Sequence, residues 1–390
     1  MYQVVHAGFD TLDIAFAGAF PKETLRLLQE AKDTAETYNR EQPVNIGPAD
    51  LPMLVQSSGM KGGYRFVMTN GPTGAIFAVK ANANPQEWNL FVSVRALRLL
   101  TLGYEETKHW LLDTLADIGF GVTDHSVNRM DYAIDIAAPG FELDIANFVC
   151  PSRMKVRHHW SKEQLVDDDG TVPQSVVRGR QFESVTVGKM PNRQIILYNK
   201  RRAAIDLKQS YWFDVWGLDR TDPNLSVWRV EIRAGRDALN KKLLRRHFEH
   251  VEAYIRDYLI TAAQDIRYIN QENTQSNISR VPDDPIWALA RSAIDELPLN
   301  APAPILESRV LETIRRQRMD MAEKQFGGNL INALVLEGHT VEDIKTNLPA
   351  LAGRAMRHYA WSLGSRKVFD RARAAHARLK ASGLLPSGKT

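Results

Sequence analysis

Residues 127–137 read VNRMDYAIDIA, and this stretch decides the fold because it places two acids inside an apolar run. The apolar residues predict a strand, an element in which aspartate is depleted. Asp131 and Asp135 lie four residues apart, so in a strand both side chains project from the same face. A buried carboxylate without a partner costs several kcal/mol or shifts its pKa until it is neutral. The stretch therefore predicts a strand whose two aspartates meet compensating groups.

A third acid, Glu231, stands mid-strand in VWRVEIRAG, between Arg229 and Arg233. If the two strands are neighbours, the three carboxylates converge, and oxygen ligands of this kind suit Mg²⁺ or Mn²⁺. Such an ion can polarise a phosphodiester and neutralise the charge that develops during displacement. The alternative is a set of structural ion pairs, with Arg129 beside Asp131 and Arg229 or Arg233 beside Glu231. The spacing alone leaves both interpretations open.

A tyrosine, Tyr198, closes the expected strand QIILYNKRRAA, whose exit carries Lys200, Arg201 and Arg202. A tyrosine hydroxyl with its usual pKa near 10 is a poor nucleophile, and neighbouring cations or a metal-bound phosphate would help it act. Attack on a phosphodiester would leave a covalent phosphotyrosine and a free 3′-OH. The alternative is a strand tyrosine that only packs.

The composition is that of an ordinary globular protein, with 390 residues of which 44% are apolar and 25% charged. The first apolar run is broken by Asp10 and Asp13, which disfavours a signal peptide, and no stretch is long enough to cross a membrane. The single cysteine, Cys150, excludes an intrachain disulfide and a cysteine metal site. We therefore expect a cytoplasmic protein. The motifs HExxH and GxSxG are absent, which disfavours zinc peptidases and α/β-hydrolases.

The order of patterns predicts two domains. Residues 1–275 alternate strand and helix patterns, including hairpins at GYRFVMTN/GAIFAVKAN and QFESVTVGK/RQIILYNKRRAA, which favours an α+β domain with an antiparallel sheet. Residues 286–390 show only helical patterns, separated at LPLNAPAPI, FGGN and LEGHT, and predict an all-α domain. Its last forty residues carry nine basic side chains and one acid, a basic tail suited to DNA or another partner.

Four stretches taken together resemble the replication initiation factor group, often called Rep_trans. This group includes rolling-circle plasmid initiators, filamentous-phage replication initiators and relaxases of integrative conjugative elements. The shared pattern is an N-terminal strand like FDTLDIAF, a strand like NRMDYAIDI, a hairpin like SVTVGKMPNRQIILYNKR and a strand like WRVEIR, in that order. The resemblance spans about residues 9–250 and implies a fold similar to HUH endonucleases, without their paired-histidine metal motif.

The resemblance also implies roles for single residues. It assigns Asp131, Asp135 and Glu231 to a divalent metal, Mg²⁺ or Mn²⁺, and Tyr198 to DNA nicking. Family hairpins usually carry a G-S-R/K turn and Y-E/D-K, whereas this chain has GKMPNRQ and YNK. This departure leaves Tyr211 as the alternative nucleophile.

The leading hypothesis is a metal-dependent DNA nickase and tyrosine strand transferase, an endonuclease that initiates rolling-circle replication or conjugative transfer of a plasmid, phage or integrative element. Its partner would be the DNA origin, presented as a single-stranded or hairpin nick site, with a helicase and a homodimer as further candidates. Basic residues would track the phosphate backbone and make binding steeply dependent on salt. We expect these residues to be Arg153, Lys155, Arg157, Arg178, Arg180, Lys200, Arg201, Arg202, Arg229 and Arg233.

Two other functions fit the same residues. One is a sequence-specific DNA-binding regulator that does not cleave, for which replacing Tyr198 would leave binding unchanged. The other is a metal-dependent hydrolytic nuclease, in which the acids activate water and Tyr198 is structural. The tryptophans Trp160, Trp212 and Trp228 are candidates for stacking on unpaired bases, with core packing favoured for Trp228.

Overall fold

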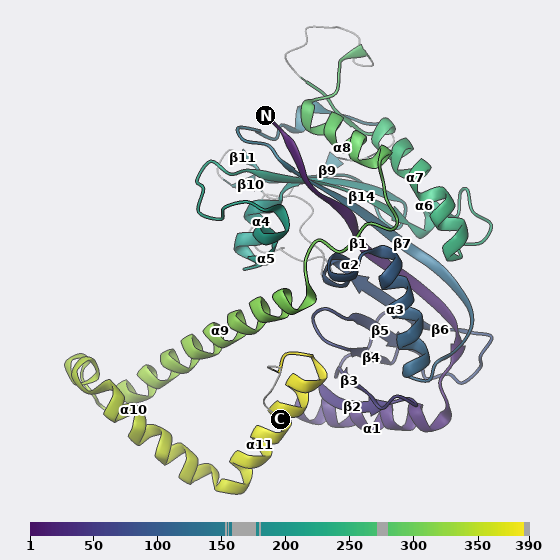
Figure 1. Cartoon of the computed structure of the whole chain (residues 1–390). Helices are drawn as coiled ribbons and strands as arrows, with labels where there is room; N and C mark the ends of the chain where they lie inside the picture. Colours follow the sequence, from purple (N-terminus) through teal and green to yellow (C-terminus); the bar gives the residue numbers. More distant parts are fainter. Residues whose placement is uncertain (153, 155, 158–176, 179–180, 271–279, 386–390) are drawn as a thin grey trace.

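The computed structural model of the protein describes residues 1–152, 154, 156–157, 177–178, 181–270 and 280–385. In this part of the chain, eleven strands form one sheet in the order β2-β3-β4-β5-β6-β1-β7-β14-β13-β12-β9 (Figure 1). Every neighbouring pair is antiparallel, which confirms the predicted α+β class with an antiparallel sheet. The strands of this sheet are β1 (Gln3–Ala19), β2 (Gln42–Ile46), β3 (Leu51–Val55), β4 (Phe66–Thr69), β5 (Ala75–Val79), β6 (Trp88–Arg95), β7 (Gly121–Ala137), β9 (Val156–Arg157), β12 (Ser184–Gly188), β13 (Arg193–Asn199) and β14 (Val227–Gly235).

Two long strands, β1 and β7, form the middle of the sheet and pair along their 17 residues each. Their register is interrupted by bulges, one of which falls between Phe9 and Thr11 and leaves Asp10 without a cross-strand partner. A bulge re-aims the side chain of the extra residue and increases the local twist. Asp10 is thereby turned toward the polar groups of the neighbouring strands.

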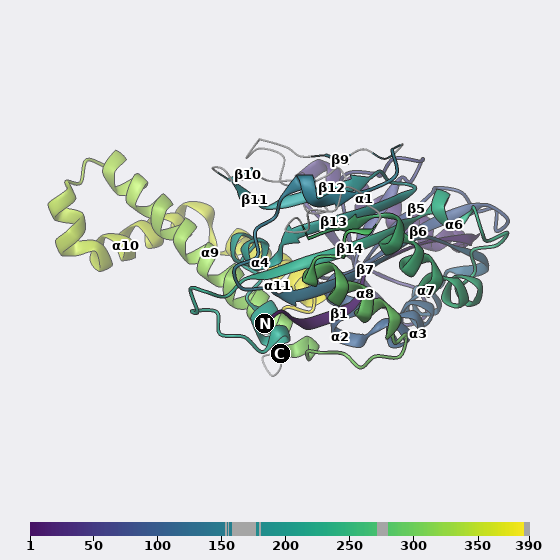
Figure 2. The same cartoon turned by 90° about the horizontal axis from the view of Figure 1, so that it is seen from above.

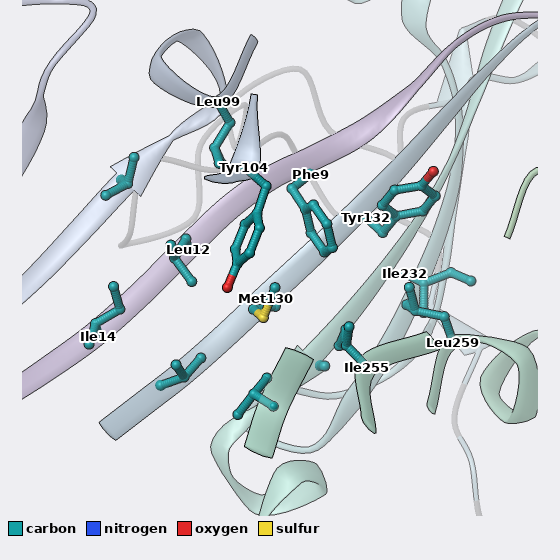
Figure 3. Packing of buried hydrophobic residues seen from close by; sticks show 14 of the residues in the cluster. Phe9, Leu12, Ile14, Leu99, Tyr104, Met130, Tyr132, Ile232, Ile255 and Leu259 are labelled. Atoms are coloured by element: carbon teal, nitrogen blue, oxygen red, sulfur yellow. The ribbon is translucent and has the colours of Figure 1, made fainter. Parts of the chain in front are cut away.

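One face of the sheet is apolar and carries the main core. The side chains of Tyr132, Ile134 and Ile136 on β7 alternate with the acids and are buried. Helices cover this core, and Figure 3 shows Ile255 and Leu259 of one helix close to Met130, Tyr132 and Ile232. The helices that contribute to the core are α1 (Lys22–Tyr38), α2 (Ala96–Leu102), α3 (Tyr104–Asp117), α6 (Arg236–Leu239), α7 (Phe248–Asp265) and α8 (Pro285–Asp295).

The last of these helices, α8, belongs to the sheet core although the sequence placed it in the second domain. Trp287 and Ile294 are fully buried, and the indole Nε1 of Trp287 donates to the carbonyl of Ala263 at 3.0 Å. The core of the sheet therefore extends past residue 275, the predicted end of the first domain. A short two-stranded pair, β8 (Phe148–Val149) with β15 (Arg267–Tyr268), leads the chain toward α8.

The opposite face of the sheet carries charged side chains and a smaller apolar cluster. The helices α4 (Lys200–Asp206) and α5 (Tyr211–Trp216) pack here with the start of α9 (Glu307–Leu336). Trp212 and Trp216 of α5 are buried and stack with a centroid separation of 5.9 Å. These helices cover the end of the face at which β7, β14 and β13 bring their polar residues together.

Beyond α8 the described chain is entirely helical, as predicted, but it does not form a compact domain. The helices α9 (Glu307–Leu336), α10 (Val341–Leu363) and α11 (Ser365–Ala381) run out from the sheet and back as three sides of an open triangle (Figures 1 and 2). Large apolar side chains such as Phe326, Trp361 and Phe369 are exposed. The end of α11 returns to β2 and β3, where Leu384 is buried. The three helices form an arm rather than a bundle with its own core.

Some predictions of single strands and helices are confirmed and others are wrong. Both expected hairpins are present, as β4–β5 and β12–β13. The glycines of FGGN do not end a helix, because Gly327 and Gly328 lie within α9. The strand at QIILYNKRRAA is shorter than expected, since the chain turns into α4 at Lys200.

We expect Trp287→Ala to lower the free energy of unfolding of the whole sheet by about 3–5 kcal/mol, because it leaves a large cavity under α8. Urea unfolding at neutral pH measures this change. Trp361→Ala is the matched control, since that side chain is 82% exposed and its loss should change stability by less than about 0.5 kcal/mol. An unchanged unfolding transition in Trp287→Ala would mean that α8 is not part of the sheet core.

Candidate active site

The strand order brings the sequence-distant polar residues onto one face. The strands β7, β14 and β13 are neighbours, and Asp135, Arg229 and Tyr198 lie directly across from one another in that order. Four residues away on each of these strands, Asp131 lies opposite Arg233, which lies opposite Gln194. The side chains of one face of these strands therefore share one polar layer, as the four-residue spacing of the two aspartates predicted.

The centre of this layer is Arg229, which is almost completely buried. Its Nε and Nη2 donate to the two carboxylate oxygens of Asp135 at 2.6 and 2.9 Å, and its Nη1 donates to Asp10 at 2.6 Å. The guanidinium also lies 4.5 Å from the ring centroid of Trp212. Arg229 thus joins β14 to β7, to β1 and to α5.

Asp135 is fully buried and has every oxygen occupied. Besides Arg229, it accepts a hydrogen bond from the indole Nε1 of Trp216 at 2.9 Å. Burial opposes ionisation of this carboxyl, but the attraction of Arg229 outweighs burial and holds the pKa of Asp135 below its usual value. Asp135 is therefore an ionised partner of Arg229 in this arrangement.

A second group of charges lies along the same face around Asp131. The Nε of Arg129 donates to both carboxylate oxygens of Asp131 at 3.0 and 2.9 Å, and Arg233 donates to Glu231 at 2.8 Å and to Gln194 at 3.0 Å. Burial raises the pKa of Asp131, whereas Arg233 and Arg229 hold the pKa of Glu231 below its usual value against the effect of burial. The nearby arginines therefore favour ionisation of Glu231 more than that of Asp131.

These contacts bear on the predicted metal ligands. Among the described residues, Asp131, Asp135 and Glu231 do not form a group of three whose ligand atoms lie within 4.8 Å of one another. Each carboxylate is bound to at least one arginine, so the arrangement corresponds to the ion-pair alternative. A divalent ion would have to displace arginine donors, and the role of the three acids as metal ligands stays a prediction.

Both candidate nucleophiles are buried. Tyr198 is 3% exposed and lies beside Arg229, and burial raises its pKa well above the usual value. Tyr211, the alternative, is buried in α5 and its pKa is also raised by burial. Arg229 lowers the pKa of Tyr198 while Glu231 and Asp10 raise it, and Arg229 and Asp10 act on the pKa of Tyr211 in the same directions.

Lys200 occupies a different place from that expected of a DNA-tracking residue. It begins α4 with its side chain buried, and its Nζ lies 4.3 Å from the ring centroid of Trp212 and 5.9 Å from that of Tyr198. Burial and the nearby Arg229 lower the pKa of Lys200 to about 8. The amino group of Lys200 therefore lies next to Tyr198 and has a pKa closer to neutral pH than that of an ordinary lysine.

The other predicted DNA-binding residues are spread over the fold. Arg229 and Arg233 are buried in the ion pairs described above, while Arg202 is exposed and pairs with Asp206 at 3.1 Å. Arg201 is half-buried and donates to the carbonyl of Asp222 at 3.2 Å. The remaining candidates have side chains outside the described residues: Arg153, Lys155, Arg157, Arg178 and Arg180.

Sequence reasoning missed several contributors to the polar layer, among them Asp10 and His6, and it left the role of Asn199 open. Asp10 belongs to the quoted stretch FDTLDIAF, but its role depends on the bulge that follows Phe9. His6 lies across from Asp135, packs edge-on against Trp212, and has its pKa lowered to about 4 by burial, so it is neutral at pH 7. Asn199, at the departure from the family pattern, caps α4 by accepting from the backbone N–H of Arg202 at 3.0 Å.

Comparison with known proteins adds little. No protein-family model matches the chain, and no curated protein matches it. Among solved structures, the chain is similar to the rolling circle replication initiator protein from Geobacillus stearothermophilus, with 15% identity over 77% of this chain and 98% of that chain and a TM-score of 0.38. A likeness at this level carries no argument about function. No helix in the described part of the chain is long and apolar enough to cross a membrane.

We expect Arg229→Met to lower the free energy of unfolding by about 3–5 kcal/mol at pH 7, because it leaves the Asp135 carboxylate buried without its partner. Adding Asp135→Asn should restore part of the loss, since the uncompensated charge is then gone. Urea unfolding of the two single variants and the double variant measures the coupling. Arg202→Met is the control and should cost less than about 1 kcal/mol, because its ion pair with Asp206 is exposed. Strictly additive effects of Arg229→Met and Asp135→Asn would contradict the coupling.

Proposed function

We propose that the protein nicks DNA and transfers the strand through a phosphotyrosine at Tyr198, starting rolling-circle replication or conjugative transfer. The observation that carries this proposal is the setting of Tyr198 between two buried cations, Arg229 and Lys200, on a face that collects charges from three strands and one helix. Buried ionisable groups with shifted pKa values gather at functional sites more often than elsewhere. The order of strand motifs along the chain, which resembles that of replication initiation factors, supports the same function.

The reaction assigns a task to each group. The Tyr198 oxygen bonds to phosphorus as its O–H proton leaves, and the bond to the 3′-oxygen breaks and that oxygen takes up a proton. The products are a 5′-phosphotyrosine and a free 3′-OH. Arg229 stabilises the charge that develops on the phosphoryl oxygens. Lys200, with a pKa near neutrality, accepts the phenol proton in its neutral form.

The burial of Tyr198 sets a condition on this function. The phenol is 3% exposed, and α5 lies over the same face through the contact of Trp212 with Arg229. A DNA strand therefore reaches the phenol only when α5 moves away from the sheet. The half-buried Arg201 and the exposed Arg202 follow Lys200 directly in α4 and suit contacts with phosphate.

Whether nicking requires a divalent ion is a separate question from the transfer to Tyr198. If Asp131, Asp135 and Glu231 hold Mg²⁺ or Mn²⁺ when DNA binds, nicking stops in EDTA and returns with either ion. If the acids act only as partners of the arginines, nicking proceeds in EDTA. The proposed transfer to Tyr198 does not depend on which result is found.

The decisive experiment incubates the purified protein with supercoiled DNA of its own replicon and Mn²⁺, then maps any DNA-linked peptide after denaturing electrophoresis. We expect an adduct on Tyr198 and loss of both adduct and nicking in Tyr198→Phe, because the attacking oxygen is gone. Tyr38→Phe is the matched control, since Tyr38 is exposed on α1. An adduct on Tyr211 would move the nucleophile to α5. Cutting that survives Tyr198→Phe without an adduct would indicate a hydrolytic nuclease, and binding without cutting would indicate a regulator.

The rate of nicking should rise between pH 6.5 and 9 and level off above the Lys200 pKa of about 8, because only the neutral amine accepts the proton. Lys200→Arg keeps the positive charge but does not titrate in this range, and should lower the single-turnover rate about 100-fold or more. Lys208→Arg, on the exposed turn after α4, is the control. A rate in Lys200→Arg equal to that of the unchanged protein would show that Lys200 serves only as a cation.

A further inference from the structure

A group of imidazole and carboxylate side chains lies at the start of α7, far from the polar layer. His247 precedes the helix, and Glu249 and His250 lie in its first turn. One ligand atom from each of these three residues lies within 4.8 Å of the other two, which is the one such trio among the described residues. The neighbouring residue on β7, His125, is six positions from Asp131, or roughly 20 Å along an extended strand, so the trio is separate from the proposed active site.

The distances within the trio match those of ligands that share one ion. The Nδ1 of His247 lies 3.5 Å from Oε1 of Glu249, and the Nδ1 of His250 lies 3.7 Å from the same oxygen. Ligands bound tetrahedrally to Zn²⁺ at about 2.0–2.1 Å are separated from one another by about 3.3–3.4 Å. Small movements of the half-buried His247 and of the exposed Glu249 and His250 side chains would bring the three ligand atoms to the distances of a bound ion.

A second observation concerns the other nitrogen of His247. Its Nε2 lies 2.8 Å from Oδ1 of Asp124 on β7, so the ring donates this N–H to a carboxylate and presents Nδ1 to the trio. Histidines that bind metals almost always donate their second N–H in this way, which fixes the tautomer and the orientation of the ring.

The ring of His247 is also held in place by its neighbours. His125 stacks on it with a centroid separation of 4.7 Å, and the Nε2 of His125 accepts the backbone N–H of Phe248 at 3.1 Å. These contacts link the first turn of α7 to β7 before any ion binds. A ligand that is oriented in advance loses less conformational freedom on binding.

We infer that His247, Glu249 and His250 bind a single divalent ion of the Zn²⁺ class, with water in the fourth position and Asp124 as the outer partner of His247. Two imidazoles and one carboxylate select a borderline transition metal over Mg²⁺, which prefers oxygen ligands. The bound ion clamps the start of α7 against β7 and stabilises the folded state, because the site exists only there.

The test measures Zn²⁺ binding to the full chain, purified and stripped of metal, by isothermal titration calorimetry, and Co²⁺ binding by visible absorption. We expect one ion per chain, Co²⁺ bands of a four-coordinate site that Zn²⁺ displaces, and a rise in the thermal unfolding temperature with Zn²⁺. His250→Ala should remove all three effects, and Asp124→Asn should weaken binding about 10–100-fold. His109→Ala, exposed on α3, is the matched control and should bind as the unchanged protein does.

Two results would overturn the inference. The first is the absence of stoichiometric Zn²⁺ binding to the unchanged chain. The second is binding that persists in both His247→Ala and His250→Ala, which would place the ion elsewhere. Circular dichroism of the stripped variants verifies their folding, and Glu249→Gln, on an exposed side chain, serves as a further ligand variant that leaves the core untouched.

Discussion

The ion pair between Arg229 and Asp135 is the interaction on which the arrangement of the molecule depends. A single guanidinium in the middle of β14 binds a carboxylate of β7, a carboxylate at a bulge of β1 and the face of a tryptophan of α5. These elements come from both ends of the sheet domain's sequence. Because a buried charge must keep all of its partners, the contacts of Arg229 fix the order of the central strands and the position of α5 at the same time.

Stability alone does not account for such a layer. Replacing a buried ion pair with apolar side chains of similar size is often neutral or stabilising, so a chain selected only to fold has no need of several adjacent pairs. Here the pairs share one face with Tyr198 and Lys200, and the opposite face of the same strands supplies an ordinary apolar core. Most of the buried charged side chains in the described part of the chain therefore lie where chemistry is proposed; Lys32 of α1 and Arg98 of α2 are the buried charges elsewhere.

The sequence predicted the class of fold and the residues of the charged face, but not which of these residues pair with one another. Period-two patterns identified β7, β13 and β14, and the spacing of Asp131 and Asp135 placed them on one face. Which carboxylate meets which arginine depends on the register and on the bulge at Asp10, and neither is encoded by local periodicity. The helical pattern after residue 286 likewise identified helices, yet it could not show that α8 completes the sheet core while α9–α11 share no core.

The charge balance of the face suggests how a phosphate can be accommodated under the proposed function. The buried cations Arg129, Arg229, Arg233 and Lys200 face the buried acids Asp131, Asp135 and Glu231, so the buried set carries one excess positive charge. Asp10 supplies the balancing negative charge, and its side chain, 19% exposed, is the most accessible of the four acids. A phosphodiester that took the place of Asp10 at Nη1 of Arg229 would keep the face neutral and would return to water the one carboxylate that is already partly hydrated. Exchange at this position costs less desolvation than exchange at Asp135, and it brings the phosphorus to the arginine that lies across from Tyr198.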